Sequence, residues 1–529
     1  MFKKNQKHIQ ADFFGYSSSL PSSYLLDIEE SMEKSFYELI FSKIREEDVS
    51  CLYSEKFSRP NAPINCIIGA ILLQHKHGWT INELFNNIKF NLLTKVALGL
   101  ETLPEMPFNQ ATFFNTQNRL NDHFVKTGIN LLETLFDNLT TEQLKALKIK
   151  TNIQRTDSFQ AASNIRRYSR LQLLVEMLIR IHRVLDDADR KSYEDLFAPY
   201  VRKTSGGFIY RLDQAEIQKG LEDIGRSYRR IYGELFPHYQ EIEIFKIFER
   251  VYEEHFTIIE ETTSLIETTA LSTDSLQSPD DLDATYVKKN KTSYRGYVVN
   301  IVETCNPENQ LNLLTDICVS ANNVDDSKNL HERLDAVKEK SPDINELHND
   351  GGYGSTENDE KCSELEITQI QTAIRGKEAA LDITIEKNDV DQYQVSCPRQ
   401  KVVATKGRKL YKAVLHETIC ATCPLTDQCN FVKVRTDKGR RYYFSDKEYY
   451  RKKRAHNIVN IPPERRSLRA NVEATVSEHR RTMPNDKVKV RGRFKTMLFA
   501  FATGIGINFV RIFRYLNGVG CENIQFSSS

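Results

Sequence analysis

The spacing of apolar residues changes several times along the 529-residue chain. From about residue 31 to residue 144, apolar residues recur at helical spacing in short segments, which predicts an all-α N-terminal domain over residues 1–145. Residues 146–158 alternate between polar and apolar positions instead, and they predict a strand that ends at Asp157. The chain therefore changes from helix-forming to sheet-forming sequence near this point.

A long helical stretch follows the first strand. Large aliphatic residues return every three or four positions, at Leu171, Leu174, Leu178, Ile181 and Leu185. Helical spacing continues with breaks to about residue 266, so we expect a helical insertion over about residues 162–270.

Short strand patterns return after the polar segment 272–283. They lie at residues 296–304, at 313–320, in the segment that leads to 348–355, and at 367–374, and a helix is predicted at 330–340. Strands that alternate with helices are typical of a mixed α/β sheet. We therefore assign residues 146–355 to the first part of a mixed α/β core, interrupted by the helical insertion.

The last third of the chain divides into three expected parts. Residues 356–465 hold one more strand and then a basic insertion with four cysteines, residues 466–517 form the last helices of the core, and residues 518–529 form a frayed tail. The segment 494–516 is apolar, but charged residues interrupt it well short of the ~18 apolar residues that a membrane span needs. We expect a buried helix there and no association with a membrane.

The overall composition is that of an ordinary soluble protein, but the charge is unevenly distributed. The chain is 40% hydrophobic and 27% charged, which excludes the collagen-like, wholly disordered and disulfide-scaffold classes. The formal net charge is only +1, yet residues 401–500 hold 25 Lys and Arg against 9 Asp and Glu, a net of +16. Solvated surface charge would scatter the two signs, so this concentration favours a nucleic acid as partner.

Two features of the sequence predict a cytoplasmic protein. The ten cysteines are ordinary usage for this length, and the first residues lack the apolar core of a signal peptide. We therefore expect the thiols to be reduced.

Three acidic residues lie at predicted element edges beside turn-forming or basic residues. They are Asp157, Asp350 and Glu473, and the last has Arg469 four positions before it and Arg480 seven after it on one predicted helix face. Carboxylates from two strand ends and a helix would form an oxygen-rich site for two Mg²⁺ or Mn²⁺ ions, which can polarise both oxygens of an in-line phosphoryl transfer. From spacing alone, a surface group or a helix cap is the commoner role for any single acid.

Several stretches of the chain resemble bacterial insertion-sequence transposases of the DDE class. Those similar to the helical N-terminal domain, to the first catalytic strand and to the strands after the helical insertion are residues 58–101 with 106–124, 155–170, and 278–289 with 296–304. NDGGYGS at 349–355 matches the Asp-x-Gly-Tyr signature, and RANVEATVSEHRR at 469–481 matches the core of the Tyr-Arg-Glu-Lys signature. The resemblance implies a ribonuclease H-like catalytic domain with an all-α N-terminal domain and two insertions.

Carried over residue by residue, the resemblance implies that Asp157, Asp350 and Glu473 are the catalytic carboxylates and bind the metal ions. Glu478 is the nearest alternative to Glu473, but it lacks the Arg-x3 spacing of the signature. The three catalytic positions would come together from segments far apart in the chain.

The resemblance also implies DNA-binding roles for Arg466, Arg469, Arg480 and Arg481. The signature carries Tyr where this chain has Arg466 and Lys where it has Arg480. A basic residue at either position can still contact phosphate, with a planar fork in place of a point charge.

Four cysteines surrounded by basic residues form the pattern C-x22-C-x2-C-x5-C, at Cys397, Cys420, Cys423 and Cys429. Four thiolates suit one tetrahedral, structural Zn²⁺ ion. Two of the cysteines do not form a second CxxC pair, so unliganded thiols are the alternative. Similar transposases carry a comparable cysteine cluster.

The resemblance implies a DNA transposase that cuts the ends of its element and joins them to target DNA by metal-dependent phosphoryl transfer. The expected partners are the terminal inverted repeats, target DNA and a second copy of the chain, in a dimer or larger assembly at the nucleoid. Two alternatives stay open: a metal-dependent nuclease without strand transfer, and an inactive transposase-derived DNA-binding protein.

Overall fold

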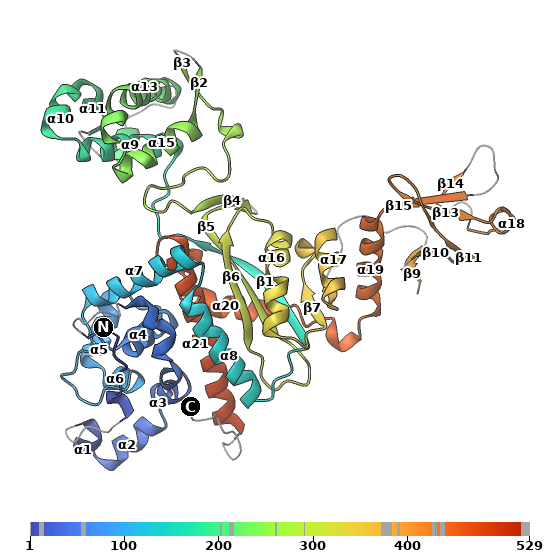
Figure 1. Ribbon diagram of the computed structural model, residues 1–529, viewed down its shortest axis with the longest axis horizontal. Helices are drawn as coiled ribbons and strands as arrows, with labels where there is room; N and C mark the ends of the chain where they lie inside the picture. Colours follow the sequence, from blue (N-terminus) through green and yellow to red (C-terminus); the bar gives the residue numbers. More distant parts are fainter. Residues whose placement is uncertain are drawn as a thin grey trace.

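The computed structural model describes residues 2–9, 15–53, 60–201, 204–210, 216–259, 262–289, 291–371, 383–388, 392–425, 429, 431–433 and 440–519. Figure 1 shows a central sheet with three attachments: the N-terminal helices, a separate helical body, and an arm built of small sheets. The mixed α/β class expected from the sequence is confirmed.

The central sheet has six strands: β1 (Ile153–Ala162), β4 (Thr285–Lys289), β5 (Thr292–Thr304), β6 (Leu314–Ala321), β7 (Glu346–Asn349) and β8 (Thr368–Gln371). Their order is β4-β5-β1-β7-β8, and β6 also pairs with β5. β5 is antiparallel to β1 and to β6, whereas β1, β7 and β8 run parallel to one another. β1 therefore lies inside the sheet, with a partner strand on each side.

Helices cover both faces of this sheet. Val299 and Ile301 of β5 join a core with α20 (Val472–Arg480) and α21 (Arg493–Val519). Val302 joins a second core with α16 (Asp326–Lys340) and α17 (Thr356–Glu364). Because successive side chains of a strand point to opposite faces, the two cores lie on opposite sides of the sheet.

The N-terminal helices share a core with the C-terminal helix. They are α1 (Tyr16–Ser19), α2 (Ser22–Glu29), α3 (Met32–Leu39), α4 (Ile64–His77), α5 (Ile81–Phe90), α6 (Leu92–Ala97), α7 (Gln110–Thr127) and α8 (Leu131–Ala146). Phe36 of α3 packs edge-on against Phe509, and Phe136 of α8 packs against Phe501 of the same helix α21. The two ends of the chain therefore pack as one unit around α21, as Figure 1 shows.

Helix α21 is long and apolar enough to cross a membrane by length and composition, with a mean hydropathy of 1.6 over the span Arg493–Gly518. However, 83% of the 18-residue window to which this hydropathy refers is buried inside the fold. It packs against α4, α8 and β6, so the predicted buried helix is confirmed.

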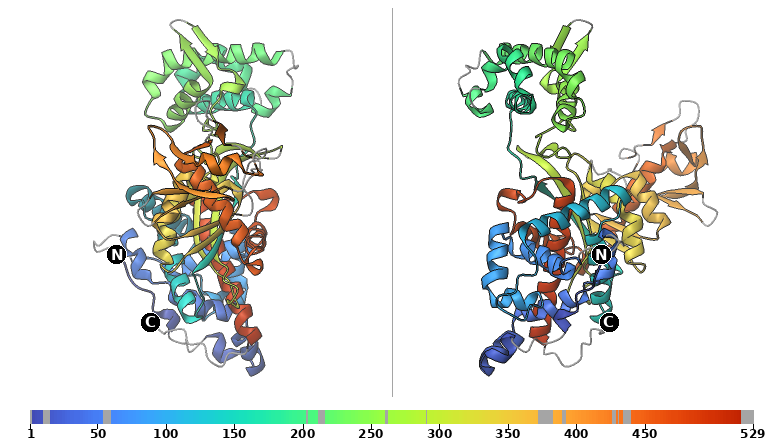
Figure 2. Two further views of the ribbon diagram at one scale, coloured as in Figure 1. Left: turned by 90° about the vertical axis from the view of Figure 1, so that its right-hand side faces the viewer. Right: turned by 60° about the vertical axis from the view of Figure 1, so that its left-hand side comes forward.

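The segment between β1 and β4 forms a helical body with a core of its own. Its elements are α9 (Arg170–Val184), α10 (Asp187–Ser192), α11 (Glu194–Val201), α12 (Ser205–Ile209), α13 (Ile217–Arg230), α14 (Phe236–Tyr239), α15 (Glu243–His255) and the hairpin β2 (Phe256–Ile259) with β3 (Thr262–Leu265). Leu174, Tyr228 and Phe248 lie at the centre of its core. Both views in Figure 2 show this body standing clear of the sheet.

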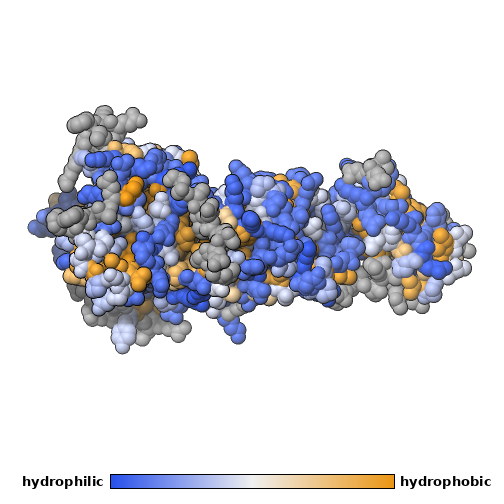
Figure 3. Space-filling view, turned by 90° about the horizontal axis from the view of Figure 1, so that it is seen from below, coloured by the Kyte–Doolittle hydropathy of each residue, from blue (hydrophilic) through white to orange (hydrophobic). Residues whose placement is uncertain are grey.

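The basic arm between β8 and α20 holds two small sheets and a long helix. Its elements are β9 (Thr384–Lys387), β10 (Tyr393–Cys397), β11 (Gln400–Val403), β12 (Thr405–Lys406), β13 (Tyr411–Leu415), α18 (Glu417–Ala421), β14 (Val432–Lys433), β15 (Arg440–Phe444) and α19 (Asp446–Asn460). Tyr393, Val395 and Phe444 bury one face of both sheets in a shared core. Seen from below, the surface between the N-terminal helices and this arm is mainly hydrophilic (Figure 3).

Two details of the expected elements are wrong. The first strand does not end at Asp157 but continues to Ala162, because β5 pairs with it along that whole length. The first of the helices expected over residues 466–517 begins only at Val472 and ends at Arg480, and turns precede it. Most of the expected tail, from residue 520 onward, lies outside the described residues.

Candidate active site

Asp157 lies in the middle of β1, where burial disfavours the ionised form of a carboxyl group. Its side chain is 13% exposed, and burial raises the pKa of this carboxyl above its usual value. The Arg469 guanidinium opposes that shift, whereas the neighbouring carboxylates of Asp350 and Asp326 add to it. The site therefore holds several acids close enough to repel one another, with a cation among them.

Asp350 follows directly after β7 and begins a 3-10 turn. Its Oδ1 accepts a hydrogen bond of 2.7 Å from the backbone N–H of Gly352. Because β7 is parallel to β1 and pairs His348 with Arg155, the same register two residues further on brings Asp350 beside Asp157. The pairing of the two strands thus places these acids together although 193 positions separate them in the chain.

Arg469 connects the three predicted carboxylates. Its Nη2 lies 3.0 Å from Oδ2 of Asp157 and 3.9 Å from Oδ2 of Asp350. Its Nη1 lies 3.4 Å from Oε1 of Glu473 on the first turn of α20. The structure therefore gathers Asp157, Asp350 and Glu473 around one guanidinium group.

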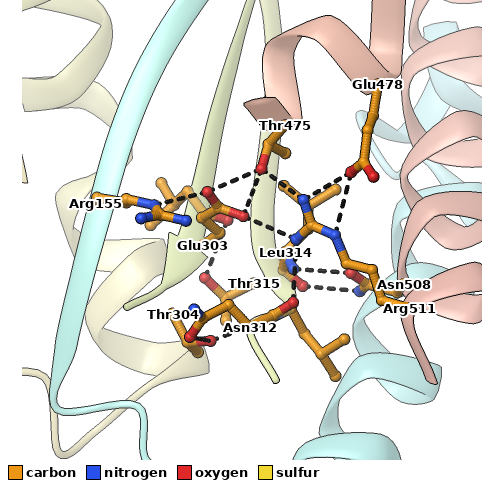
Figure 4. A network of polar contacts seen from close by, with 12 residues as sticks. Arg155, Glu303, Thr304, Asn312, Leu314, Thr315, Thr475, Glu478, Asn508 and Arg511 are labelled. Atoms are coloured by element: carbon orange, nitrogen blue, oxygen red, sulfur yellow. Dashed lines mark hydrogen bonds and ion pairs between the residues drawn. The ribbon is translucent and has the colours of Figure 1, made fainter. Parts of the chain in front are cut away.

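A buried polar network holds α20 against the sheet beneath this site, as Figure 4 shows. Glu303 of β5 is fully buried and accepts hydrogen bonds from Nε of Arg155 at 2.7 Å and from Nη1 of Arg511 at 2.9 Å. The Thr475 hydroxyl of α20 donates to the same carboxylate. Arg155 also donates to the carbonyl of Leu468 at 2.7 Å, directly before Arg469. The network therefore fixes the backbone from which Arg469 and Glu473 project.

Glu478, the alternative to Glu473, belongs to this network instead. Both Nε and Nη2 of Arg511 donate to its Oε2, at 3.1 and 2.7 Å. Since Arg511 is on the buried helix α21, Glu478 is held away from the Arg469 group. The geometry thus favours Glu473 as the third carboxylate.

A fourth acid lies at the same place and was not expected from the sequence. Asp326 begins α16, and the Ser158 hydroxyl, next to Asp157 on β1, donates to it at 2.8 Å. Its charge also raises the pKa of Asp157. An acidic residue at the start of a helix commonly stabilises the positive end of the helix dipole. No local sequence pattern therefore distinguishes Asp326 from such a residue.

The donor set suits divalent metal ions. Mg²⁺ and Mn²⁺ prefer carboxylate oxygens, and the protein already stabilises a positive charge, that of Arg469, between these carboxylates. Among the described residues, no three His, Cys, Asp or Glu side chains are arranged to hold a metal ion, either at this site or at the four predicted cysteines. The cation that lies between these carboxylates in the structure is Arg469.

Among the described residues, the other predicted DNA-binding arginines form no ion pair with the three carboxylates, which pair with Arg469. Arg466, Arg480 and Arg481 are exposed. Arg480 lies 3.2 Å from Asp486 and over the ring of Phe159. Glu473 and Arg480 lie seven residues apart on α20 and share one helix face, as expected, whereas Arg469 lies in a turn before α20 rather than within the same helix.

The four predicted cysteines come together in the arm. Cys397, Cys420, Cys423 and Cys429 line one small pocket of about 20 Å³. Gln400 donates to Sγ of Cys420 at 3.3 Å. Burial raises the pKa of the Cys420 thiol, and the proximity of Cys429 and Cys397 contributes in the same direction. Sequence elements separated by 32 residues therefore form one thiol cluster.

Comparison with known proteins gives one result. Residues 393–513 match a family model described as a transposase DDE domain. The matched region contains the cysteine cluster, the four arginines and Glu473, whereas Asp157 and Asp350 precede it. Neither the curated proteins nor the solved structures that were searched gave a match. The family match over residues 393–513 confirms the predicted resemblance to DDE-class transposases.

Proposed function

We propose that this protein is the transposase of a bacterial insertion sequence, which cuts the ends of its element and joins them to target DNA. The observation that carries the proposal is the convergence of Asp157, Asp350 and Glu473 on Arg469. Each acid comes from a different element, and a separate buried network holds the third element in place.

The sheet topology supports a ribonuclease H-like catalytic domain. In chain order the core strands are β1, β5, β6, β7 and β8. Strand β5 is antiparallel to β1 and to β6, whereas β7 and β8 run parallel to β1. The order β6-β5-β1-β7-β8 is the one expected for that fold, with α16 and α17 as the connecting helices. The helical body and the basic arm are then the two insertions.

The carboxylates of Asp157, Asp350 and Glu473 would hold two Mg²⁺ or Mn²⁺ ions, which supply charge stabilisation for both oxygens of an in-line displacement. Asp157 and Asp350 would supply ligands from rigid strand positions, and Glu473 from the start of α20. Arg469 would exchange its carboxylate contacts for a phosphate of the bound DNA. The glycines after Asp350 let the turn pack closely, because a Cβ at Gly352 would lie 2.9 Å from Oδ1 of Asp350 and one at Gly354 would lie 2.8 Å from Nε2 of Gln371.

Two displacements at phosphorus make up the reaction. In the first, the oxygen of water attacks the phosphorus at the element end, the bond to the 3′-oxygen breaks, and that oxygen leaves as a hydroxyl. In the second, this 3′-hydroxyl attacks a target phosphate, and a new 3′-oxygen leaves. The protein contributes positioning and electrostatic stabilisation, without a covalent intermediate.

Several further assignments belong to the same proposal. The N-terminal helices bind the terminal inverted repeats or a second subunit, because joining two ends requires both to be held together. The active form is a dimer or larger assembly at the bacterial nucleoid. The cysteine cluster holds one structural Zn²⁺, since four thiols in one pocket match its preferred ligands.

An assay with the element's own ends tests the proposal. Purified protein, Mn²⁺ and DNA that carries those ends are expected to give metal-dependent cleavage and joined products, and the Asp350→Asn variant neither. Cleavage without joining would instead indicate the nuclease, and DNA binding without cleavage the inactive relative.

A further inference from the structure

A polar hollow of about 560 Å³ lies beside the carboxylate site, between the glycine turn after Asp350 and helix α19. Gly351, Gly352 and Gly354 form one part of its wall, and the start of α16 forms another. Lys447, Arg451 and Arg454 line it from α19. The hollow therefore joins the catalytic core to the basic arm.

Two buried donors at this hollow have no acceptor among the described residues. Gln371, at the end of β8, is 3% exposed and lines the hollow, yet its Nε2 has no hydrogen-bond partner there. The Nε of Arg454 is likewise buried and unpaired. A buried donor without an acceptor costs about 1–3 kcal/mol, so two at one wall point to a ligand that brings acceptor atoms.

The charges of the hollow indicate that this ligand is an anion. Lys447 is exposed and forms no hydrogen bond or ion pair with the part of the chain that the structure describes. Lys289 also lines the hollow from β4.

The acids of the hollow are partly neutralised. Asp326 accepts from Ser158 at 2.8 Å and lies 3.9 Å from Nζ of Lys289. Asp359, beneath the hollow, is paired with Nη1 of Arg454 at 2.6 Å. Since Asp325 and Asp326 lie on the side of α16, the wall formed by α19 is the one that suits an anion.

We propose that this hollow binds a backbone phosphate of the DNA strand, next to the phosphate that is cut. The proposal rests on the proposed function, in which Asp350 belongs to the catalytic site. The Gly352 N–H that holds Asp350 lies in the same turn that lines the hollow. A strand whose scissile phosphate lies at the carboxylates continues past this turn toward α19. Lys447 and Arg451 contact the phosphate, and Gln371 and Arg454 complete its hydrogen bonds.

The salt dependence of DNA binding tests this proposal. Full-length protein is titrated with a short fluorescent DNA duplex at several salt concentrations, as wild type, Lys447→Ala and the matched control Lys453→Ala. Lys453 is exposed on the same helix but does not line the hollow. Loss of one phosphate contact is expected to reduce the slope of log K against log salt by about 0.9 in Lys447→Ala only. Gln371→Glu places a carboxylate in the lining of the hollow, and this variant is expected to bind DNA more weakly than Lys447→Ala does.

The outcomes separate this site from the function as a whole. If wild type binds and cuts DNA but Lys447→Ala keeps the wild-type slope, the hollow does not bind the strand. If inorganic phosphate raises the melting temperature of wild type but not of Lys447→Ala while the DNA slopes agree, the hollow takes a free anion and the DNA assignment is wrong. If wild type binds no DNA, the proposed function itself fails.

Discussion

The Nη2 atom of Arg469 lies 3.0 Å from Oδ2 of Asp157, although 312 positions separate the two residues in the chain. The guanidinium thus lies where the proposed function places the metal ions. Asp157 is mostly buried, and its pKa is raised by burial and lowered by Arg469. The arginine therefore acts as a counter-ion for the carboxylates in the form of the protein described here.

Removal of this counter-ion should separate metal binding from catalysis. In Arg469→Ala, the carboxylates lose a competing cation, so we expect Mn²⁺ to bind about tenfold more tightly, or ~1.4 kcal/mol. DNA cleavage should nevertheless fall by about 10²-fold, because a phosphate-binding charge is lost. Calorimetric titration of Mn²⁺ and a cleavage assay measure the two effects.

Arg466→Ala is the control for this prediction, because Arg466 is exposed and, among the described residues, forms no ion pair with the three carboxylates. Its Mn²⁺ affinity should equal that of wild type. Weaker Mn²⁺ binding in Arg469→Ala would show that the arginine supports the metal site rather than competing for it.

The network below the site should matter for stability. Glu303→Gln leaves the buried guanidinium group of Arg155 without its charged partner and removes one of the two carboxylates that pair with Arg511, which keeps Glu478. We expect a loss of about 3–5 kcal/mol in the free energy of unfolding, measured by urea denaturation. Glu478→Gln, which removes a partly exposed partner of Arg511 alone, should cost about 1 kcal/mol or less. Equal losses of unfolding free energy in the two variants would contradict the view that Glu303 is the main acceptor of this network.

How far the sequence predicts this site depends on the range of each contact. The contact of Arg469 with Glu473 follows from their spacing of four residues. The convergence of Asp157 and Asp350 could be stated only through the family resemblance, because it depends on the register between β1 and β7. Asp326 was missed since its role arises from packing of α16 beside Ser158.

The fold shows the same division between local and distant information. The helical period predicts α16 and α21 within a few residues, and alternation predicts β5 and β6. The strands of the arm were missed because they are two to five residues long, too short for a periodic signal. The end of β1 was misplaced because pairing with β5 extends it through Ala162.

The ion pair between Asp359 and Arg454 should give a measurable pH dependence. Burial raises the pKa of Asp359 to about 6, with Arg454 opposing the shift. A carboxyl with a raised pKa in the folded state binds more protons than in the unfolded state, so its contribution to stability is present at low pH and is lost as pH rises from about 4 to 6. Relative to Asp359→Asn, wild type should lose up to about 3 kcal/mol over this range.

Urea denaturation of both proteins at several pH values provides the measurement. Groups that titrate identically in the two proteins cancel in the difference. A difference in unfolding free energy that stays constant from pH 4 to pH 7 would contradict the raised pKa of Asp359.

The thiol cluster should hold metal. Elemental analysis of purified protein is expected to find about one zinc ion per chain. The ion should be lost in the double variant Cys420→Ser and Cys423→Ser, and kept in Cys51→Ser, whose cysteine is exposed in the N-terminal domain. Folded wild-type protein without zinc would show that the pocket contains unliganded thiols.

In the proposed function, the three carboxylates around Arg469 hold the metal ions for DNA cleavage. The most direct measurement is Mn²⁺-dependent cleavage of DNA with the element's ends by Asp157→Asn, Asp350→Asn, Glu473→Gln and, as the matched control, Glu478→Gln, each first shown to be folded. We expect each of the first three changes to reduce cleavage by about 10³-fold or more, and Glu478→Gln to retain most of the wild-type rate. Wild-type rates in Glu473→Gln together with loss of cleavage in Glu478→Gln, or wild-type rates in either aspartate variant, would contradict the account.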